Sequence, residues 1–249
     1  MRSDAPHRTD SSRSWWRDYL ADPADGPLPA LLLVLTISTG LIDAVSILAL
    51  GRVFVANMTG NIVFIGFALA GAPGFSLAAS LIALAGFLAG AGLGGFAVRR
   101  RNQHRGVLLR DVTAVELVLI TAGAVLTALA HAPLGSAVRE VTVALAAVAL
   151  GMQNAAARRL AVPDLTTTVL TMTLTGVAAD LRNRDVRVAV RRILSVGAML
   201  IGALVGAVLT INVNASAAIF AVSALIAVVA LGAVVASRDH SPWHAFRHG

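Results

Sequence analysis

The sequence contains no cysteine and no lysine, and only 13% of its residues are charged. Without cysteine there is no disulfide framework, no thiolate nucleophile and no cysteine-based metal site. Because 57% of the residues are hydrophobic, too few polar side chains remain to coat a water-exposed surface. These shortages exclude an ordinary soluble domain and indicate a chain that lipid largely covers.

Long apolar segments are what the sequence has instead. A hydrocarbon core about 30 Å thick needs roughly 20 apolar residues for each helical crossing. Most of the segments are too long and too uniformly apolar to be strands of a barrel. The sequence therefore predicts an all-α, polytopic helical membrane protein. The apolar segments lie at 28–50, 53–71, 75–98, 107–130, 137–157, 163–181, 193–212 and 215–236.

The domain organisation follows from the segments. Residues 1–27 are polar and end in Trp15, Trp16 and Tyr19, which predicts a disordered arm with an interfacial aromatic anchor. Residues 28–236 form a single membrane domain, and 237–249 form a tail. The first segment lacks a small-residue cleavage site, so we expect it to remain as a helix.

Two segments do not look like simple spanning helices. The second opens with Asn57-Met58-Thr59-Gly60-Asn61, and the sixth begins at Pro163-Asp164 and is rich in threonine. Such residues compete for backbone hydrogen bonds or interrupt the helix, which is tolerated at membrane depth only inside protein or beside a water-filled cavity. We predict broken or re-entrant helices at 53–71 and 163–181.

The two halves of the domain, about 28–130 and 137–236, resemble each other at a spacing of about 111 residues. Gly40-Leu41-Ile42-Asp43-Ala44 recurs as Gly151-Met152-Gln153-Asn154-Ala155. Met58-Thr59 aligns with Leu170-Thr171, and Gly90 and Gly94 align with Gly202 and Gly206. The same order and nearly the same offset indicate an internal repeat.

The distribution of the arginines between the two sides of the membrane favours one of two topologies. If all eight segments span, the arginines divide almost evenly between the two sides. If segments two and six enter and leave on the same side, only Arg52 and Arg139 of the 20 basic residues lie outside. The positive-inside rule favours this second arrangement. It predicts six spanning helices plus two broken or re-entrant helices, cytoplasmic termini, and halves that are inverted relative to each other.

Asp43 and Glu116 are ionisable residues inside apolar segments. Such residues are costly in lipid and usually mark a pathway or a partner. We expect Asp43 to be the essential one, because its repeat counterpart Asn154 is also polar, and because the hydroxyl groups that precede it, on Thr36, Ser38 and Thr39, can solvate it. The same offset carries Glu116 onto Ala227 or Val228. The alternatives are structural: Asp43 could pair with Arg52 or a threonine, and Glu116 lies near the polar end of its helix.

Other polar residues complete the candidate substrate- or ion-binding set. Amides and hydroxyls at the starts of two short helices would suit an anionic or carbonyl-bearing ligand, although Asn57 and Asp164 could equally be plain N-caps. The stripe of Gly86, Gly90 and Gly94 is better explained by close helix packing. The candidates besides the two carboxyl groups are Asn57, Thr59, Asn61, Gln153, Asn154, Thr167, Thr168 and Thr171.

No fingerprint of a hydrolase, metalloprotease, nucleotide-binding or dinucleotide-binding enzyme is present. We therefore expect no enzymatic activity, no catalytic residue and no cofactor. His240, His244 and His248 have a metal-ligand spacing, but Pro242 interrupts that helix, so no metal site is predicted. The arginines are topology determinants and lipid contacts, so nucleic acid is not an expected partner. The sequence is also compatible with a homo-oligomer.

These motifs resemble the YoaK family of bacterial integral membrane proteins, a domain-of-unknown-function family. The likeness rests on Gly40-x-x-Asp43-Ala44, the Asn57–Asn61 run, the Gly151–Ala155 run and Thr167-Thr168-Val169-Leu170-Thr171 leading to Ala179-Asp180-Leu181. It covers about residues 30–235 and departs from the family pattern at Met172, where glycine is usual. The resemblance implies a bacterial inner-membrane protein without an established activity.

Two classes of function compete. Intramembrane carboxyl groups, paired broken helices and an inverted repeat are typical of secondary transporters, which bind an unidentified small molecule near the midplane. A carboxyl group in that site could couple transport to protons. The alternative is a structural, assembly or sensor protein whose polar residues only join helices. A passive channel ranks third and a membrane-embedded enzyme fourth.

Overall fold

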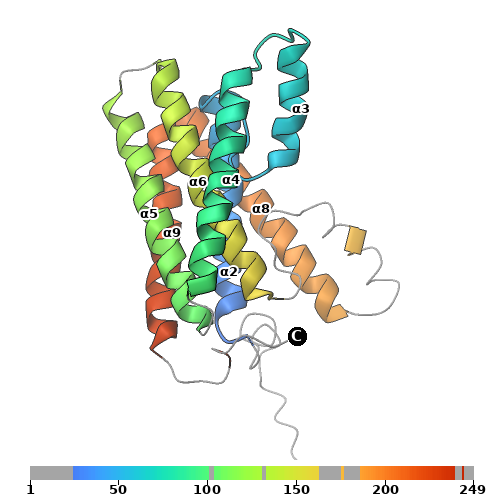
Figure 1. The fold of residues 1–249 in the computed structure, drawn as a ribbon, viewed down its shortest axis with the longest axis vertical. Helices are drawn as coiled ribbons and strands as arrows, with labels where there is room; N and C mark the ends of the chain where they lie inside the picture. The colour runs from blue at the N-terminus through green and yellow to red at the C-terminus, as the bar shows by residue number, and fades with distance from the viewer. Residues whose placement is uncertain are drawn as a thin grey trace, which may run out of the picture.

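The computed structural model describes residues 25–100, 104–130, 133–162, 175–176, 186–238 and 243. Candidate residues Thr167, Thr168 and Thr171 and the tail histidines lie outside this part of the chain. The seven helices of this part of the chain are arranged as a bundle (Figure 1). They are α2 (Leu28–Ala49), α3 (Met58–Leu69), α4 (Leu77–Arg100), α5 (Arg105–Leu129), α6 (Ser136–Leu160), α8 (Val186–Asn212) and α9 (Ala215–Ser237).

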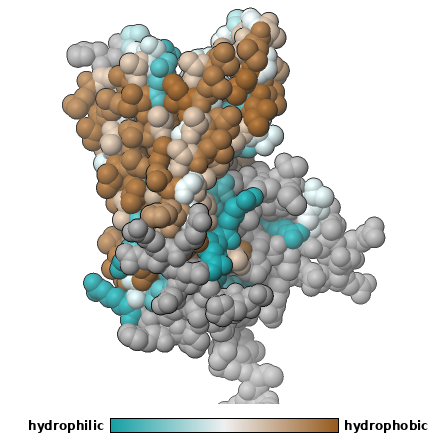
Figure 2. Space-filling view, viewed as in Figure 1, coloured by the Kyte–Doolittle hydropathy of each residue, from teal (hydrophilic) through white to brown (hydrophobic). Residues whose placement is uncertain are grey.

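Six of these helices are long and apolar enough to cross a membrane. The shortest of them, α2, has 22 residues, which at 1.5 Å per residue gives about 33 Å. Their outer faces carry exposed leucine, isoleucine and valine, and Figure 2 shows this hydrophobic surface over much of the bundle. The prediction of a polytopic helical membrane protein with six spanning helices is confirmed.

The described arginines separate to the two ends of the bundle. Arg52 follows α2 and Arg139 lies in the first turn of α6, so both belong to one end, here called the arginine-poor end. The other described arginines lie near the C-terminal ends of α4, α6 and α9 or the N-terminal parts of α5 and α8. Because the helices alternate in direction, these all belong to the opposite, arginine-rich end.

Helix α3 enters and leaves the bundle at the arginine-poor end, as predicted for segment 53–71. It has 12 residues, about 18 Å, which is too short to span. Gly74, after α3, packs against the guanidinium of Arg52, before it. Phe64 of α3 stacks on Phe54 with ring centroids 5.7 Å apart. In Figure 1, α3 stands at the edge of the bundle beside α4.

Glycines bring the spanning helices into backbone contact. In the parallel pair α2 and α8, a side chain on Gly40 would collide with the carbonyl oxygen of Met199, and one on Gly202 with that of Ile37. Glycine therefore lets the two backbones approach closely, and the predicted stripe of Gly86, Gly90 and Gly94 in α4 packs against α6 in the same way.

The same contacts recur in the parallel pair α6 and α4. There a side chain on Gly151 would meet the carbonyl oxygen of Phe87, and one on Gly90 that of Val148. Gly40 and Gly151 are 111 residues apart in the sequence, and Gly90 and Gly202 are 112 residues apart. The sequence repeat therefore corresponds to a repeated set of helix contacts, with α5 and α9 packed against each other between the two pairs.

Candidate functional site

A layer of polar side chains divides the core at half height. An apolar cluster at the arginine-poor end includes Leu41 and Ile120, and another at the arginine-rich end includes Leu35 and Val112. Between them lies a set of buried polar residues, which we call the polar layer. It comprises Thr36, Ser38 and Thr39 of α2, Thr113 and Glu116 of α5, and Gln153 of α6.

Asp43 lies about one helical turn from the polar layer, toward the arginine-poor end. Its side chain is buried, and its Oδ1 accepts hydrogen bonds from the backbone N–H groups of Val55 (3.0 Å) and Ala56 (3.1 Å). Its Oδ2 is buried without a hydrogen-bond partner. The carboxyl group therefore holds the non-helical stretch that leads into α3, rather than pairing with Arg52, which is exposed.

Asn61 holds the same stretch from the other side. Its Oδ1 accepts from the N–H of Phe54 (2.8 Å), and its Nδ2 donates to the carbonyl oxygen of Phe54 (2.6 Å). Asp43 and Asn61 together satisfy three consecutive N–H groups, on Phe54, Val55 and Ala56. Non-helical backbone at membrane depth requires such internal partners, because lipid offers none.

The remaining candidates of this segment point elsewhere. Asn57 and Thr59 are exposed, and Asn57 occupies the N-cap position of α3 without a side-chain capping bond. Asn57 therefore stands at the N-cap, as the alternative interpretation expected, but its side chain makes no capping hydrogen bond there.

The hydroxyl groups of α2 do not solvate Asp43, contrary to expectation. Thr36 donates to the carbonyl of Leu32, and Ser38 and Thr39 both donate to that of Leu35. Hydroxyls within a helix commonly bond back to the preceding turn, and this local geometry is available before any tertiary contact forms.

One hydrogen bond crosses between the repeat halves inside the polar layer. Gln153 donates from Nε2 to the Thr39 hydroxyl oxygen at 3.1 Å, and its Oε1 is buried without a partner. The neighbouring Asn154 is half-buried and takes part in a polar interaction. Of the motif predicted in α6, Gln153 thus joins the polar layer directly.

Glu116 is the most isolated charged residue of the described core. Its side chain is fully buried, and neither carboxyl oxygen has a hydrogen-bond partner. An isolated charge at this depth is costly. A proton, a cation or another partner must therefore offset it.

Two cavities open at the arginine-poor end. A larger one of about 540 Å³ lies among the ends of α2, α5, α6 and α9. A smaller one of about 290 Å³ lies beside the turn before α4. Arg139 lines both, whereas neither Asp43 nor Glu116 lines either of them. Sequence analysis treated Arg139 only as a topology signal and missed this position.

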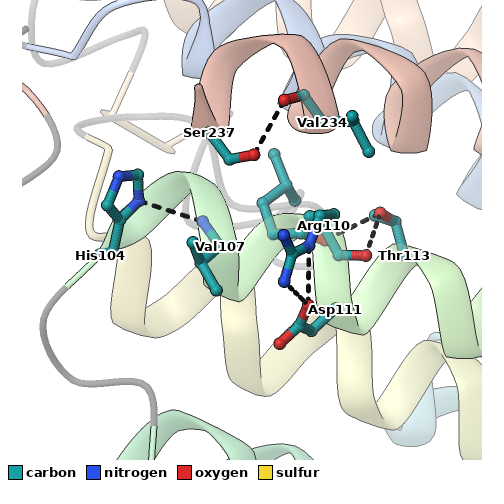
Figure 3. A network of polar contacts seen from close by, with 8 residues as sticks. His104, Val107, Arg110, Asp111, Thr113, Val234 and Ser237 are labelled. Carbon is teal, nitrogen blue, oxygen red and sulfur yellow. Dashed lines mark hydrogen bonds and ion pairs between the residues drawn. The ribbon is translucent and has the colours of Figure 1, made fainter. Parts of the chain in front are cut away.

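At the arginine-rich end, polar contacts join several parts of the chain. Arg105 is buried and bonds Asp25 at 3.0 Å and the carbonyl of Leu160 at 2.6 Å. Figure 3 shows the adjoining network on α5 and α9, in which His104 caps α5 and Arg110 pairs with Asp111. Sequence analysis missed the Arg105 cluster, because its members are 55 to 138 residues apart and no local motif marks them.

Fold and site together define a polytopic helical membrane protein with buried carboxyl groups and a re-entrant helix. The chain belongs to the family described as "Protein of unknown function (DUF1275)", whose family model matches residues 31–232. It is 31% identical over 156 residues to the UPF0700 transmembrane protein YoaK of Bacillus subtilis (strain 168), covering 62% of this chain and 67% of that protein. No solved structure matches the chain.

Proposed function

We propose that the protein is a small-molecule secondary transporter of the bacterial inner membrane, working by alternating access. The observation that carries this proposal is the matched pair of helix contacts, α2 with α8 and α6 with α4. In this proposal each half supplies three of the six candidate spans, so that corresponding helices run in opposite directions. Inverted repeats of this kind give carriers two related conformations that open to opposite sides.

The re-entrant segment supports the proposal. Carriers bind substrates where helices are interrupted near the midplane, because free backbone groups and helix ends are available there. In this chain the interruption at residues 53–57 is held at the depth of Asp43. Glu116, buried without a partner, adds a group that could carry a proton across the layer.

The orientation belongs to the proposal. The arginine-rich end faces the cytoplasm, so both termini are cytoplasmic. The natural absence of cysteine permits a direct test: a single cysteine at residue 103, in the connection between α4 and α5, should react with a membrane-impermeant maleimide only in inverted vesicles. Reaction in intact cells would overturn this orientation.

Transport itself is tested in two stages. First, the purified protein is screened for thermal stabilisation by a panel of metabolites, because a ligand that binds the native state raises its apparent stability. Each hit is then supplied, radiolabelled, to proteoliposomes with and without a proton gradient. Saturable uptake that exceeds empty liposomes supports the proposal. Stabilisation without uptake of any hit would overturn it.

The carboxyl groups are compared in the same assay. Asp43→Asn keeps an oxygen acceptor for Val55 and Ala56, so we expect the fold to survive while proton-driven uptake is lost. We expect a milder loss for Glu116→Gln. Full proton-driven uptake by Asp43→Asn together with inactivity of Glu116→Gln would reverse these roles.

A structural or sensor protein is the second candidate, and a specific observation favours it. Asp43 and Asn61 form their hydrogen bonds with the backbone before α3. A purely structural role explains these bonds without any substrate. That function predicts no stabilising metabolite. It also predicts that Asp43→Asn behaves as the native protein in every assay.

A further inference from the structure

A buried arginine joins four separate parts of the chain at the arginine-rich end. Arg105 is the first residue of α5, and its side chain is only 3% exposed. Its Nη2 donates to Asp25, just before α2, and to the carbonyl oxygen of Leu160, the last residue of α6. Its Nη1 donates to the carbonyl oxygen of Trp243, beyond α9, at 3.4 Å.

Trp243 also contacts the residues that precede α2. The indole of Trp243 lies so close to Gly26 that a Cβ there would come within 2.6 Å of the ring. Gly26 has a φ of +55°, a conformation that glycine adopts at little cost. Sequence analysis assigned Gly26 to the arm and Trp243 to the tail, and the structure packs both against the membrane domain. We call Arg105, Asp25, Leu160 and Trp243 the arginine latch.

The repeat assigns counterparts to the latch at the opposite end. Leu160 follows Gly151 by nine residues, as Ala49 follows Gly40. The offset of 111 residues that pairs Gly40 with Gly151 carries Arg105 onto Ser216, in the first turn of α9. The same offset carries Asp25 onto Ser136, the first residue of α6.

All three counterparts line cavities at the arginine-poor end. Ala49 and Ser216 line the cavity of about 540 Å³, and Ser136 lines the one of about 290 Å³. The place that a guanidinium and its partners fill at one end is therefore a hollow at the other. If the arginine latch served only to stabilise the fold, there would be no reason for a cavity at the corresponding position of the other end.

We propose that Arg105 is the latch of a gate, closing the arginine-rich end while the cavity at the arginine-poor end is open. Opening requires Arg105 to release Asp25 and Leu160, and the cavity closes in exchange. This inference rests on the proposed alternating access. The latch suits a two-state device because a buried ion pair is stable only while both charges meet, and separating them requires water to enter. Its bond to the last carbonyl of α6 adds the favourable contact of a cation with a helix C-terminus.

The experiment uses the naturally cysteine-free chain in nanodiscs, where both faces are accessible. One reporter is Ala157→Cys, buried near the latch, and the other is Ala49→Cys, in the cavity lining. Each is combined with Arg105→Gln, or with the milder Asp25→Asn, and labelled with a small hydrophilic methanethiosulfonate. Arg110→Gln is the matched control, because it breaks a partly exposed ion pair on the same helix.

We expect either latch variant to raise the labelling rate of Ala157→Cys several-fold and to lower that of Ala49→Cys. The control should change neither. A rise at Ala157→Cys with no fall at Ala49→Cys would show a staple and overturn the gate, as would unchanged labelling at both. Thermal unfolding of Asp25→Asn verifies that the fold is intact, since its amide oxygen can still accept from Arg105.

The labelling experiment needs no substrate, so it can contradict the gate without contradicting transport, and the uptake assay can contradict transport without contradicting the gate. Reciprocal labelling in a protein that transports nothing overturns transport and supports the gate. Robust uptake with unchanged labelling overturns the gate alone.

Discussion

The first half of the membrane domain, from α2 to α5, and the second, from α6 to α9, pack through the same contacts but carry different chemistry. Gly40 and Gly151 each approach a carbonyl oxygen of the partner helix, on Met199 and Phe87. Shape is therefore repeated where backbones meet.

Charge is not repeated. Asp43 corresponds to Asn154, Arg105 to Ser216, and Glu116 to an alanine or valine of α9. The charged member of each pair lies in the first half. Close backbone contact needs glycine at every crossing, whereas a buried charge is costly and needs to be present only once. The difference indicates a symmetric frame that carries an asymmetric set of polar groups.

The largest expected effect tests the repeated frame. Gly40→Ala and Gly151→Ala each push a methyl group against a carbonyl oxygen, and overpacking of this kind costs about 1–3 kcal/mol or more. We expect both variants to lower the thermal unfolding midpoint in detergent by similar amounts. Gly92→Ala is the control, because the space around Gly92 is open and alanine favours the helix. A tolerated Gly151→Ala beside a destabilised Gly40→Ala would break the comparison.

The next effect concerns the charge present in one half only. Asp43→Leu leaves the N–H groups of Val55 and Ala56 without their acceptor, at about 1–3 kcal/mol for each buried group. Asp43→Asn keeps the acceptor oxygen and should unfold close to the native midpoint. The measurement is thermal unfolding of the two variants side by side. Equal midpoints would mean that these hydrogen bonds contribute nothing to stability.

Much of the frame could be predicted because its signals are local. Apolar length indicates the spans, the partition of the arginines favours a non-spanning segment at 53–71, and glycine spacing marks the helix contacts. These features follow from a residue's own size, charge or conformational freedom. Asp43 could be predicted for the same reason, because a charged residue inside an apolar segment is a local signal.

The partners within the site could not be predicted, because they depend on tertiary contacts. Asp43 bonds backbone N–H groups 12 and 13 residues away, and a backbone amide has no side-chain signature. The hydroxyls near Asp43 were expected to face it, yet the preceding helical turn offers them a nearer acceptor. In the sequence Arg105 is one basic residue among several, because no local motif shows that Asp25 and Trp243 contact it.

The smallest effect sharpens the comparison inside the polar layer. Thr39 and Gln153 form a bond between the halves, whereas the residues at the equivalent places, Leu150 and Ile42, are apolar and buried. Thr39→Val alone leaves the amide of Gln153 without its acceptor and should lower stability by about 1–3 kcal/mol. Gln153→Met alone removes the amide and should cost less.

The double variant Thr39→Val/Gln153→Met makes this pair as apolar as its counterpart while nearly preserving its shape. Replacing both partners of a buried hydrogen bond in this way can be nearly neutral, so we expect its unfolding midpoint to return close to the native value. A double-mutant cycle measures the coupling, and the double variant should lose less stability than the sum of the two single variants. Additive losses would show that the bond does not couple the halves. If stability returns but uptake in proteoliposomes does not, the polar layer is retained for function, and the asymmetry between the halves belongs to transport rather than to folding.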